Sequence, residues 1–400
     1  MKTPGCGVCA RIASVSGPVW LRLAVLFAIT LVAGPAVRLA AAQEYLLSND
    51  DSFTNGVSFY SIGSDGSLTF VQQVAGPGLG IGGGYFGMAR VVSLSDSSNQ
   101  CIFASEAFTS DIMSIPANGS ASAGQFFGSA NDTGASNGIG LAVNSKYLYA
   151  SFSDASTIGT FQVQPSCQLL FVGDIAVGGL NGGIIDGMAI HGNMMIATYA
   201  DGTIESFNIG SGIPVSNGDR QISTASAGGM SYPNGIDITQ DGRFAIFGDT
   251  SVFDIIEVSD ISSGKLTPTV MYKTHSGISS SNIMLSPDET ILYISNTQGD
   301  VITAVFFDKN TGQITPGCKS PRIRGYVDSF SYLAGMTLQQ TTGNGGGVYV
   351  AEFGGPSWIA TVNLTVNGSK CKLKETPASP FEDPYSQGLL SLGRFPPRAF

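Results

Sequence analysis

Residues 292–296 read Leu-Tyr-Ile-Ser-Asn, and this short apolar strand recurs along the chain at intervals of about fifty residues. The seven copies are Tyr45–Asn49, Ile102–Glu106, Leu148–Phe152, Met195–Tyr199, Ala245–Asp249, Leu292–Asn296 and Val348–Glu352. A period of this length is typical of repeat architectures in which each unit buries its apolar faces against its neighbours.

Other predicted strands surround each copy. A β-rich segment follows it, as in Val57–Ile62, Ile158–Val163, Thr203–Ile209 and Val301–Phe307, and a polar turn then leads to a third strand. A further strand precedes most copies and starts with a polar or small residue and glycine, as at Phe86-Gly87, Asn137-Gly138, Asp186-Gly187, Asn234-Gly235, Ala334-Gly335 and Gln387-Gly388; Ser281-Asn282 lacks the glycine. Alternating apolar positions between Gly, Asn and Asp turns indicate strands. The sequence therefore predicts an all-β, seven-bladed propeller with four antiparallel strands per blade.

The two ends of the repeat region complement each other. The first copy, Tyr45–Asn49, lacks a strand before it, and the last predicted strand, Gln387–Leu392, lacks partners after it. We expect these segments to pair and close the ring, which leaves no open sheet edge. A β-solenoid or a pair of β-sandwiches would not require complementary halves. The inner-strand glycines are expected where seven strands crowd a narrow axis.

The first 42 residues have the pattern of an export signal. Basic residues at Lys2, Arg11 and Arg22 precede an apolar run, and Ala40-Ala41-Ala42 forms a small-residue cleavage site. We predict a signal peptide over 1–42, the propeller over 43–400, and a secreted or periplasmic protein with no membrane attachment after cleavage. A retained anchor is the alternative, but the apolar run is short for a span of ~20 residues. With a net charge of −10, the chain is not expected to bind nucleic acid.

Export affects how the cysteines are interpreted. Four of the six cysteines lie beyond the signal, and an even number suits an oxidising compartment. By repeat register, Cys101 and Cys167 fall on the same rim of blades 2 and 3, while Cys318 and Cys371 fall in the outer strands of the neighbouring blades 6 and 7. We predict disulfides Cys101–Cys167 and Cys318–Cys371; for the first pair, buried free thiols are the alternative.

The motifs resemble the seven-bladed lactonase family of 6-phosphogluconolactonases and carboxymuconate cyclases. The resemblance rests on Ser286-Pro287-Asp288, on the strand Ile291–Asn296, and on the turn Asp308–Ile314. It implies hydrolysis or isomerisation of a small lactone or cyclic acid. Where family members often carry Pro-His, this chain has Pro233-Asn234. Asn234 and Asp186 are also similar to the inner-strand residues that bind a divalent cation in gluconolactonase-type propellers.

Candidate site residues gather around one mouth of the predicted axial channel. Inner strands contribute Asn137, Asp186, Asn234 and Asn282 as candidate ligands of a divalent cation such as Ca²⁺, which prefers hard oxygen donors. The candidate general bases are Glu106 and Glu352. The candidate substrate-binding residues are Asn49, Tyr199, Tyr232, Asp249, His275 and Asn296. Arg90 is the one well-placed arginine, so an unphosphorylated lactone or carbohydrate-derived ligand is favoured.

Two alternatives stay open. Asn and Asp before Gly also serve tight turns, so the ring of polar residues can be turn chemistry with no metal or other cofactor. The chain can also be a non-catalytic extracellular propeller, a monomer that binds a glycan or a protein through its loops.

Overall fold

The computed structural model of the protein describes residues 44–76, 78–80, 90–97, 99–116, 125–128, 139–153, 155–223, 235–248, 255–274, 280–296, 299–324, 332–353, 357–386 and 391–397. All of these belong to one compact unit, Ala42–Phe400. Within the described ranges, no helix has the length and apolar character needed to cross a membrane.

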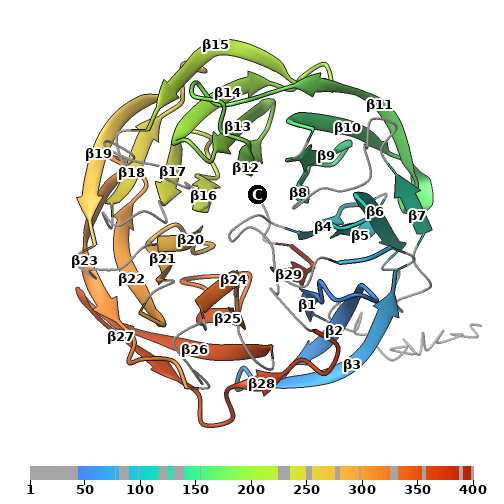
Figure 1. The fold of residues 1–400 in the computed structure, drawn as a ribbon. Coiled ribbons are helices and arrows are strands. Elements are labelled where there is room, and N and C mark those ends of the chain that lie inside the picture. The colour runs from blue at the N-terminus through green and yellow to red at the C-terminus, as the bar shows by residue number, and fades with distance from the viewer. Residues whose placement is uncertain are drawn as a thin grey trace, which may run out of the picture. The chain divides into compact units, whose positions relative to one another are not determined.

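Seven antiparallel sheets are arranged around a central axis (Figure 1), which confirms the predicted seven-bladed propeller. Each blade has four strands, of which the first named lies nearest the axis and the fourth lies outermost. Blade 1 consists of β29 (Ser391–Phe395), β1 (Tyr45–Asn49), β2 (Gly56–Ile62) and β3 (Leu68–Ala75). Blade 2 consists of β4 (Val91–Ser95), β5 (Gln100–Glu106), β6 (Asp111–Pro116) and β7 (Gln125–Gly128). Blade 3 consists of β8 (Ile139–Val143), β9 (Tyr147–Phe152), β10 (Thr157–Val163) and β11 (Leu169–Ala176). A 3₁₀ turn, η1 (Pro165–Cys167), precedes β11.

Blades 4 to 7 continue the pattern. Blade 4 consists of β12 (Ile185–His191), β13 (Met194–Tyr199), β14 (Thr203–Asn208) and β15 (Val215–Ile222), and blade 5 of β16 (Gly235–Ile238), β17 (Phe244–Gly248), β18 (Ile255–Asp260) and β19 (Thr267–Lys273). Blade 6 consists of β20 (Ser280–Leu285), β21 (Ile291–Asn296), β22 (Val301–Asp308) and β23 (Gln313–Lys319). Blade 7 consists of β24 (Tyr332–Leu338), β25 (Gly347–Phe353), β26 (Trp358–Asn367) and β27 (Lys370–Glu375). Blade 7 adds β28 (Phe381–Glu382), which pairs with the start of β26.

The ring closes within blade 1, as predicted. β29 pairs antiparallel with β1, with Ser391 opposite Asn49 and Phe395 opposite Tyr45. The described strand runs from Ser391 to Phe395 and so continues beyond the predicted end at Leu392, while residues 387–390 lie outside the described part of the chain. The Arg394 side chain donates a 2.9 Å hydrogen bond to the Leu338 carbonyl of blade 7, so the closing strand is also tied to its other neighbour.

The hydrophobic core is divided among the seven blade interfaces. Each interface contains its own cluster of buried side chains. Side chains alternate along a strand, so successive residues of β5 pack in opposite directions: Ile102 faces blade 1, and Cys101 and Phe103 face blade 3. Each blade therefore buries both of its faces only when both neighbours are present.

The tyrosine of the repeated strand has a recurring role. Its hydroxyl donates a hydrogen bond to a turn carbonyl of the next blade: Tyr149 to Gly212 at 3.0 Å, Tyr293 to Asn344 at 2.7 Å, and Tyr349 to Gly66 at 3.1 Å. This inter-blade bond gives a physical reason for the Leu-Tyr and Val-Tyr copies of the motif.

Crowding near the axis explains the inner-strand glycines. A Cβ atom at Gly235 would lie 2.9 Å from the Ile283 backbone nitrogen, and one at Gly393 would lie 3.0 Å from the Val91 carbonyl oxygen. Both contacts join inner strands of adjacent blades, so these positions favour glycine.

Candidate functional site

The strand register places the ends of the second strands and the starts of the inner strands on one face of the ring. Asn49 lies opposite Ser391, and Glu352 lies opposite Leu333. Five of the predicted site residues, Asn137, Tyr232, Asn234, Asp249 and His275, fall outside the described residues. The other seven can be placed.

Three predicted substrate-binding residues are buried and hydrogen-bonded within the fold. Asn49 donates to the Ser105 carbonyl of blade 2 at 2.8 Å, and Asn296 donates to the Val301 carbonyl at 3.0 Å. The Tyr199 hydroxyl donates to Glu205 Oε2 at 3.0 Å. These bonds hold blades and turns together, and substrate binding by the three residues stays a prediction.

Glu106 is a fully buried carboxyl at the end of β5. Its Oε1 accepts a 2.8 Å hydrogen bond from the Gly78 backbone N–H, whereas Oε2 has no hydrogen-bond partner among the described residues. Burial raises the pKa of Glu106 to about 7, against the opposing effect of the Gly78 bond and with a further contribution from the charge of Asp111. A carboxyl with this pKa can both lose and regain a proton near neutral pH.

The connection from blade 1 to blade 2 passes directly over this carboxyl. A Cβ atom at Gly76 would overlap Glu106 Oε1, and one at Gly78 would lie 2.6 Å from Oε2. The connection is held by further hydrogen bonds, from Leu79 N to Thr109 Oγ1 at 3.1 Å and from Gly80 N to the Ser52 carbonyl at 2.8 Å. The two glycines therefore allow the backbone to approach the carboxyl closely.

Glu352 is the corresponding acid of blade 7. Burial raises its pKa to about 8, and the nearby charges of Glu375 and Asp300 add to the effect. Its Oε1 has no hydrogen-bond partner within the described ranges. The arginines of the connection from blade 6 bind the neighbouring acids, because Arg322 Nε lies 3.2 Å from Asp300 Oδ2 and Arg324 Nε lies 3.2 Å from Glu375 Oε2.

Of the four candidate cation ligands on the inner strands, Asp186 and Asn282 lie among the described residues. Asp186 is buried at a β-bulge of β12, between Ile185 and Gly187, where the register against β13 shifts. Bulges redirect side chains and are common near functional sites. Asn282 is half-buried beside the equivalent bulge of β20. In the part of the chain that the structure describes, no three acidic, histidine or cysteine side chains come close enough to form a metal site.

Arg90, the arginine expected nearest the mouth, is committed to an internal ion pair. Its Nη1 lies 2.7 Å from Asp51 Oδ2, and both side chains are buried. The backbone N–H of Arg90 donates to the hydroxyl oxygen of Ser391 at 3.0 Å. The guanidinium is thus directed at a protein carboxylate between blades 1 and 2, which does not favour phosphate recognition by this residue.

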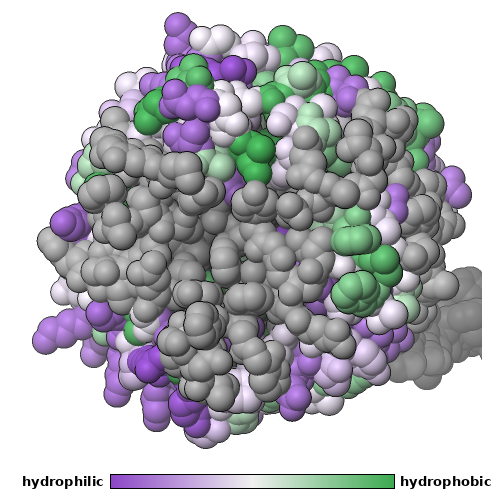
Figure 2. Space-filling model, in the orientation of Figure 1, coloured by the Kyte–Doolittle hydropathy of each residue, from purple (hydrophilic) through white to green (hydrophobic). Residues whose placement is uncertain are grey.

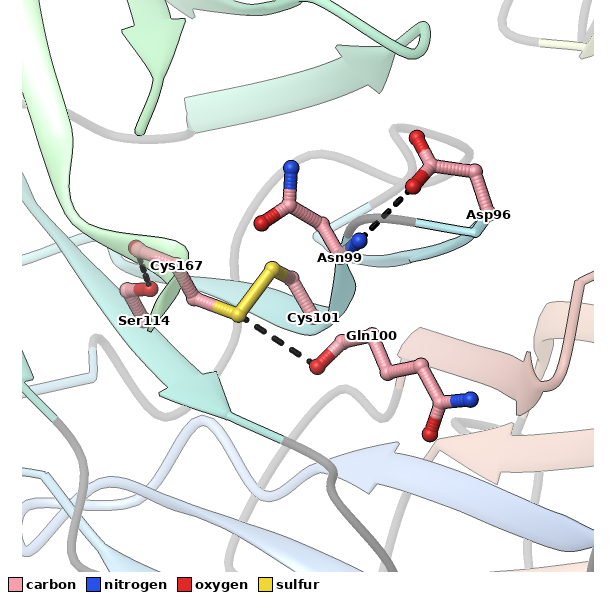
Figure 3. Close-up of a disulfide and its surroundings, with 6 residues drawn as sticks. All are labelled: Asp96, Asn99, Gln100, Cys101, Ser114 and Cys167. Atoms are coloured by element: carbon pink, nitrogen blue, oxygen red, sulfur yellow. Dashed lines mark hydrogen bonds between the residues drawn. A yellow bond between two sulfur atoms is a disulfide. The ribbon is translucent and has the colours of Figure 1, made fainter. Parts of the chain in front are cut away.

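Both predicted disulfides are present. Cys101 and Cys167 join β5 to the turn before β11, with Cα atoms 5.5 Å apart (Figure 3), and Cys318 and Cys371 join β23 to β27 at the same Cα separation. Figure 3 also shows the Ser114 hydroxyl donating to the Cys167 carbonyl. Each disulfide links adjacent blades, as the repeat register predicted.

Comparison with known proteins establishes the fold of the chain. No protein-family model and no curated protein matches its sequence. Solved structures do match. A candidate 6-phosphogluconolactonase from Bacteroides fragilis is 14% identical with a TM-score of 0.65, and covers 88% of this chain and 99% of its own. A periplasmic gluconolactonase from Pseudomonas aeruginosa is 16% identical with a TM-score of 0.52, and covers 68% and 80%. The chain has the fold of these lactonase-like propellers.

A third match extends the same fold beyond named lactonases. A functionally unknown protein from Desulfotomaculum acetoxidans is 12% identical with a TM-score of 0.61, over 88% of this chain and 98% of its own. At such identities the likeness establishes the architecture, and the resemblance inferred from the sequence is confirmed to that extent.

The sequence did not indicate every residue around the site. The stretch from Gly78 to Gly84 has the composition of a flexible connection, but Gly78 binds Glu106, and 81–89 lie outside the described residues. The signal that could have found this contact is the Gly76-Pro77-Gly78 spacing directly after an outer strand. Asp51, which follows the repeated strand of blade 1, was also missed.

Proposed function

We propose that the protein is an exported lactonase that hydrolyses a small unphosphorylated lactone, with Glu106 as general base. The observation that carries the proposal is the Glu106 carboxyl, which combines a pKa of about 7, one oxygen fixed by Gly78 and one oxygen without a described partner. The lactonase-like fold supports the reaction class only by analogy.

The proposed reaction needs one proton carrier. Water attacks the lactone carbonyl carbon while its proton passes to Glu106 Oε2. The tetrahedral intermediate then expels the ring oxygen, which takes the proton back from Glu106 and gives the hydroxy acid. Because Glu106 is fully buried beneath Gly76 and Gly78, the proposed reaction requires this connection to move before water and substrate can reach Oε2. Glu352, with its higher pKa, is the second candidate for proton transfer.

Lactone turnover with matched variants tests this proposal. The full secreted chain is mixed with neutral five- and six-membered sugar lactones and acid lactones, and ring opening is followed by the proton released with each acid formed. We expect turnover to fall about 10²- to 10⁴-fold in Glu106→Gln and to be unchanged in Glu257→Gln. Glu257 is also buried, but both its oxygens accept serine hydroxyls, at 2.7 Å from Ser223 and 2.8 Å from Ser259.

The pH profile supplies a second readout. A general base acts in its ionised form, so kcat/KM should rise with pH and reach half its maximum near pH 7, the pKa of Glu106. Full activity in Glu106→Gln, or a rate that does not change between pH 5 and 9, would contradict the assignment.

The preference for an unphosphorylated substrate follows from the charges. Arg90 is engaged by Asp51, and the arginines near Glu352 are engaged by Asp300 and Glu375. A phosphorylated lactone should therefore be turned over no faster than its neutral counterpart. Export is supported by the pattern of residues 1–42 and by the two disulfides, which persist in oxidising compartments.

A non-catalytic binding propeller is the second candidate, and one observation favours it. Phe53 and Phe108 are exposed on neighbouring turns of blades 1 and 2, and the Phe108 N–H donates to the carbonyl of Leu79 between them. Figure 2, in the orientation of Figure 1, shows apolar side chains over the strands of blade 2. For a binder of this kind, Phe53→Ser and Phe108→Ser would abolish ligand binding while Glu106→Gln would leave it intact.

A further inference from the structure

A second group of buried polar side chains lies away from Glu106, where blade 7 returns to blade 1. It comprises Ser48, Asp50, Ser58, Tyr60 and Asp383, which we call the closure cluster. Their side chains are at most 2% exposed. Neither the lactonase proposal nor the predicted cation ligands on the inner strands use any of them.

The strand register brings four of these residues onto one sheet face. Ser48 lies opposite Ser58 in the β1–β2 pair, and Leu46 lies opposite Tyr60. Leu46 and Tyr60 pack against blade 7, so Ser48, Asp50 and Ser58 point the same way by alternation. Asp383 approaches from the connection that follows β28.

Each carboxylate in the cluster is held by one oxygen only. Gln73 Nε2 donates to Asp50 Oδ2 at 2.7 Å, and the Tyr385 N–H donates to Asp383 Oδ1 at 3.0 Å. The remaining oxygens, Asp50 Oδ1 and Asp383 Oδ2, have no hydrogen bond of ordinary geometry to a described residue. Partners that fix one carboxylate oxygen and orient the other are typical of metal ligands.

The three hydroxyl groups of the closure cluster also lack ordinary hydrogen bonds within the described ranges. Ser48 Oγ, Ser58 Oγ and Tyr60 Oη are buried without a hydrogen bond of ordinary geometry to the described residues. Burial raises the pKa of both acids, and the charge of Asp383 raises that of Asp50 further. The hydroxyls lie near enough to act against this, Ser58 on the pKa of Asp50 and Ser48 and Tyr60 on the pKa of Asp383. Two acids and three hydroxyls therefore lie close together, and five of their oxygens have no hydrogen bond of ordinary geometry among the described residues.

We infer that the closure cluster binds a hard divalent cation, with Ca²⁺ the best match. Five buried oxygens, two of them from carboxylates, suit Ca²⁺, which takes six to eight oxygen ligands in tolerant geometry and can complete its shell with water. The ion would offset the two carboxylate charges, whose burial without a counter-charge is costly. It would also tie the return connection to blade 1, alongside the 2.9 Å hydrogen bond from Ser386 Oγ to the Asp50 carbonyl.

Calcium titration of the full secreted chain, first stripped with a chelator, tests the inference. Binding is measured by calorimetry, and the melting temperature is measured with and without CaCl₂. We expect one Ca²⁺ per chain and a melting temperature that rises with its concentration. Asp50→Asn and Asp383→Asn should weaken binding by about tenfold or more. Glu257→Gln should leave it unchanged, because both oxygens of this buried acid accept serine hydroxyls.

A milder substitution guards against variants that fail to fold. Tb³⁺ bound in the cluster should luminesce on tyrosine excitation, and Tyr60→Phe should remove most of that signal while the chain stays folded. Absence of Ca²⁺ binding in the wild type would overturn the inference. So would a calcium-dependent melting shift that persists in both Asp50→Asn and Asp383→Asn, or Tb³⁺ luminescence that Tyr60→Phe leaves unchanged.

Discussion

Glu106 and Glu257 are both buried glutamates, and they differ in what their oxygens contact. Glu257 accepts two serine hydroxyls, whereas Glu106 accepts a single backbone N–H. Hydrogen bonds to the ionised form lower a carboxyl pKa, and burial without enough of them raises it. Glu257, with both oxygens hydrogen-bonded, is therefore the matched buried control for Glu106.

Stability should depend on pH through Glu106. Its folded pKa of about 7 lies above the ordinary value of 4.5, so the stabilisation by the neutral form is complete below about pH 4.5 and is lost as pH rises through about 7. The stability of the wild type relative to Glu106→Gln should therefore fall between pH 5 and pH 8. Urea unfolding at pH 5 and pH 8 measures this difference in stability. If the stability of the wild type relative to Glu257→Gln fell by the same amount, the pH dependence would be assigned to another group.

Arg90→Met should destabilise the fold by about 3–5 kcal/mol, because it removes one partner of a buried ion pair and leaves Asp51 buried without its guanidinium. Urea unfolding at pH 7 provides the measurement. Arg322→Met is the matched control: its side chain is 57% exposed in the pair with Asp300, so we expect a change below about 1 kcal/mol. Equal losses in the two variants would show that burial does not decide the cost.

At the scale of single elements, the repeated strand allowed most of the fold to be predicted. Copies such as Leu148–Phe152 and Leu292–Asn296 could be found because period-two apolar patterns and polar turns are local signals. The site was less predictable. The pKa of Glu106 depends on Gly78, which lies nearly thirty residues earlier, and the closure cluster joins Asp50 to Asp383 from opposite ends of the chain. No local pattern encodes such contacts.

The two disulfides connect elements of adjacent blades, and their removal should loosen those interfaces. Replacing Cys101 and Cys167 together by serine, or Cys318 and Cys371 together, should each cost about 2–5 kcal/mol, since the bridges close loops with sequence separations of 66 and 53. Urea midpoints of the two double variants provide the measurement. Unchanged midpoints in both would mean that the interfaces hold without covalent support.

For the molecule as a whole, β29 should decide whether the ring is cooperative. Ending the chain after residue 386 removes β29, exposes the edge of β1 and removes Arg394 from blade 7. We expect a broad, non-cooperative urea transition. As a control, moving 387–397 in front of residue 44 rebuilds blade 1 as one hairpin series and should restore a single sharp transition. A sharp transition in the truncated chain would show that closure is dispensable.

The division of the core among blade interfaces has a consequence during biosynthesis. β1 leaves the ribosome early and β29 late, so the first blade waits through nearly the whole of translation for its innermost strand. Until then, the apolar faces of blades 1 and 7 lack their final partners. We therefore expect the nascent chain to keep apolar surface exposed until its last strand has been synthesised.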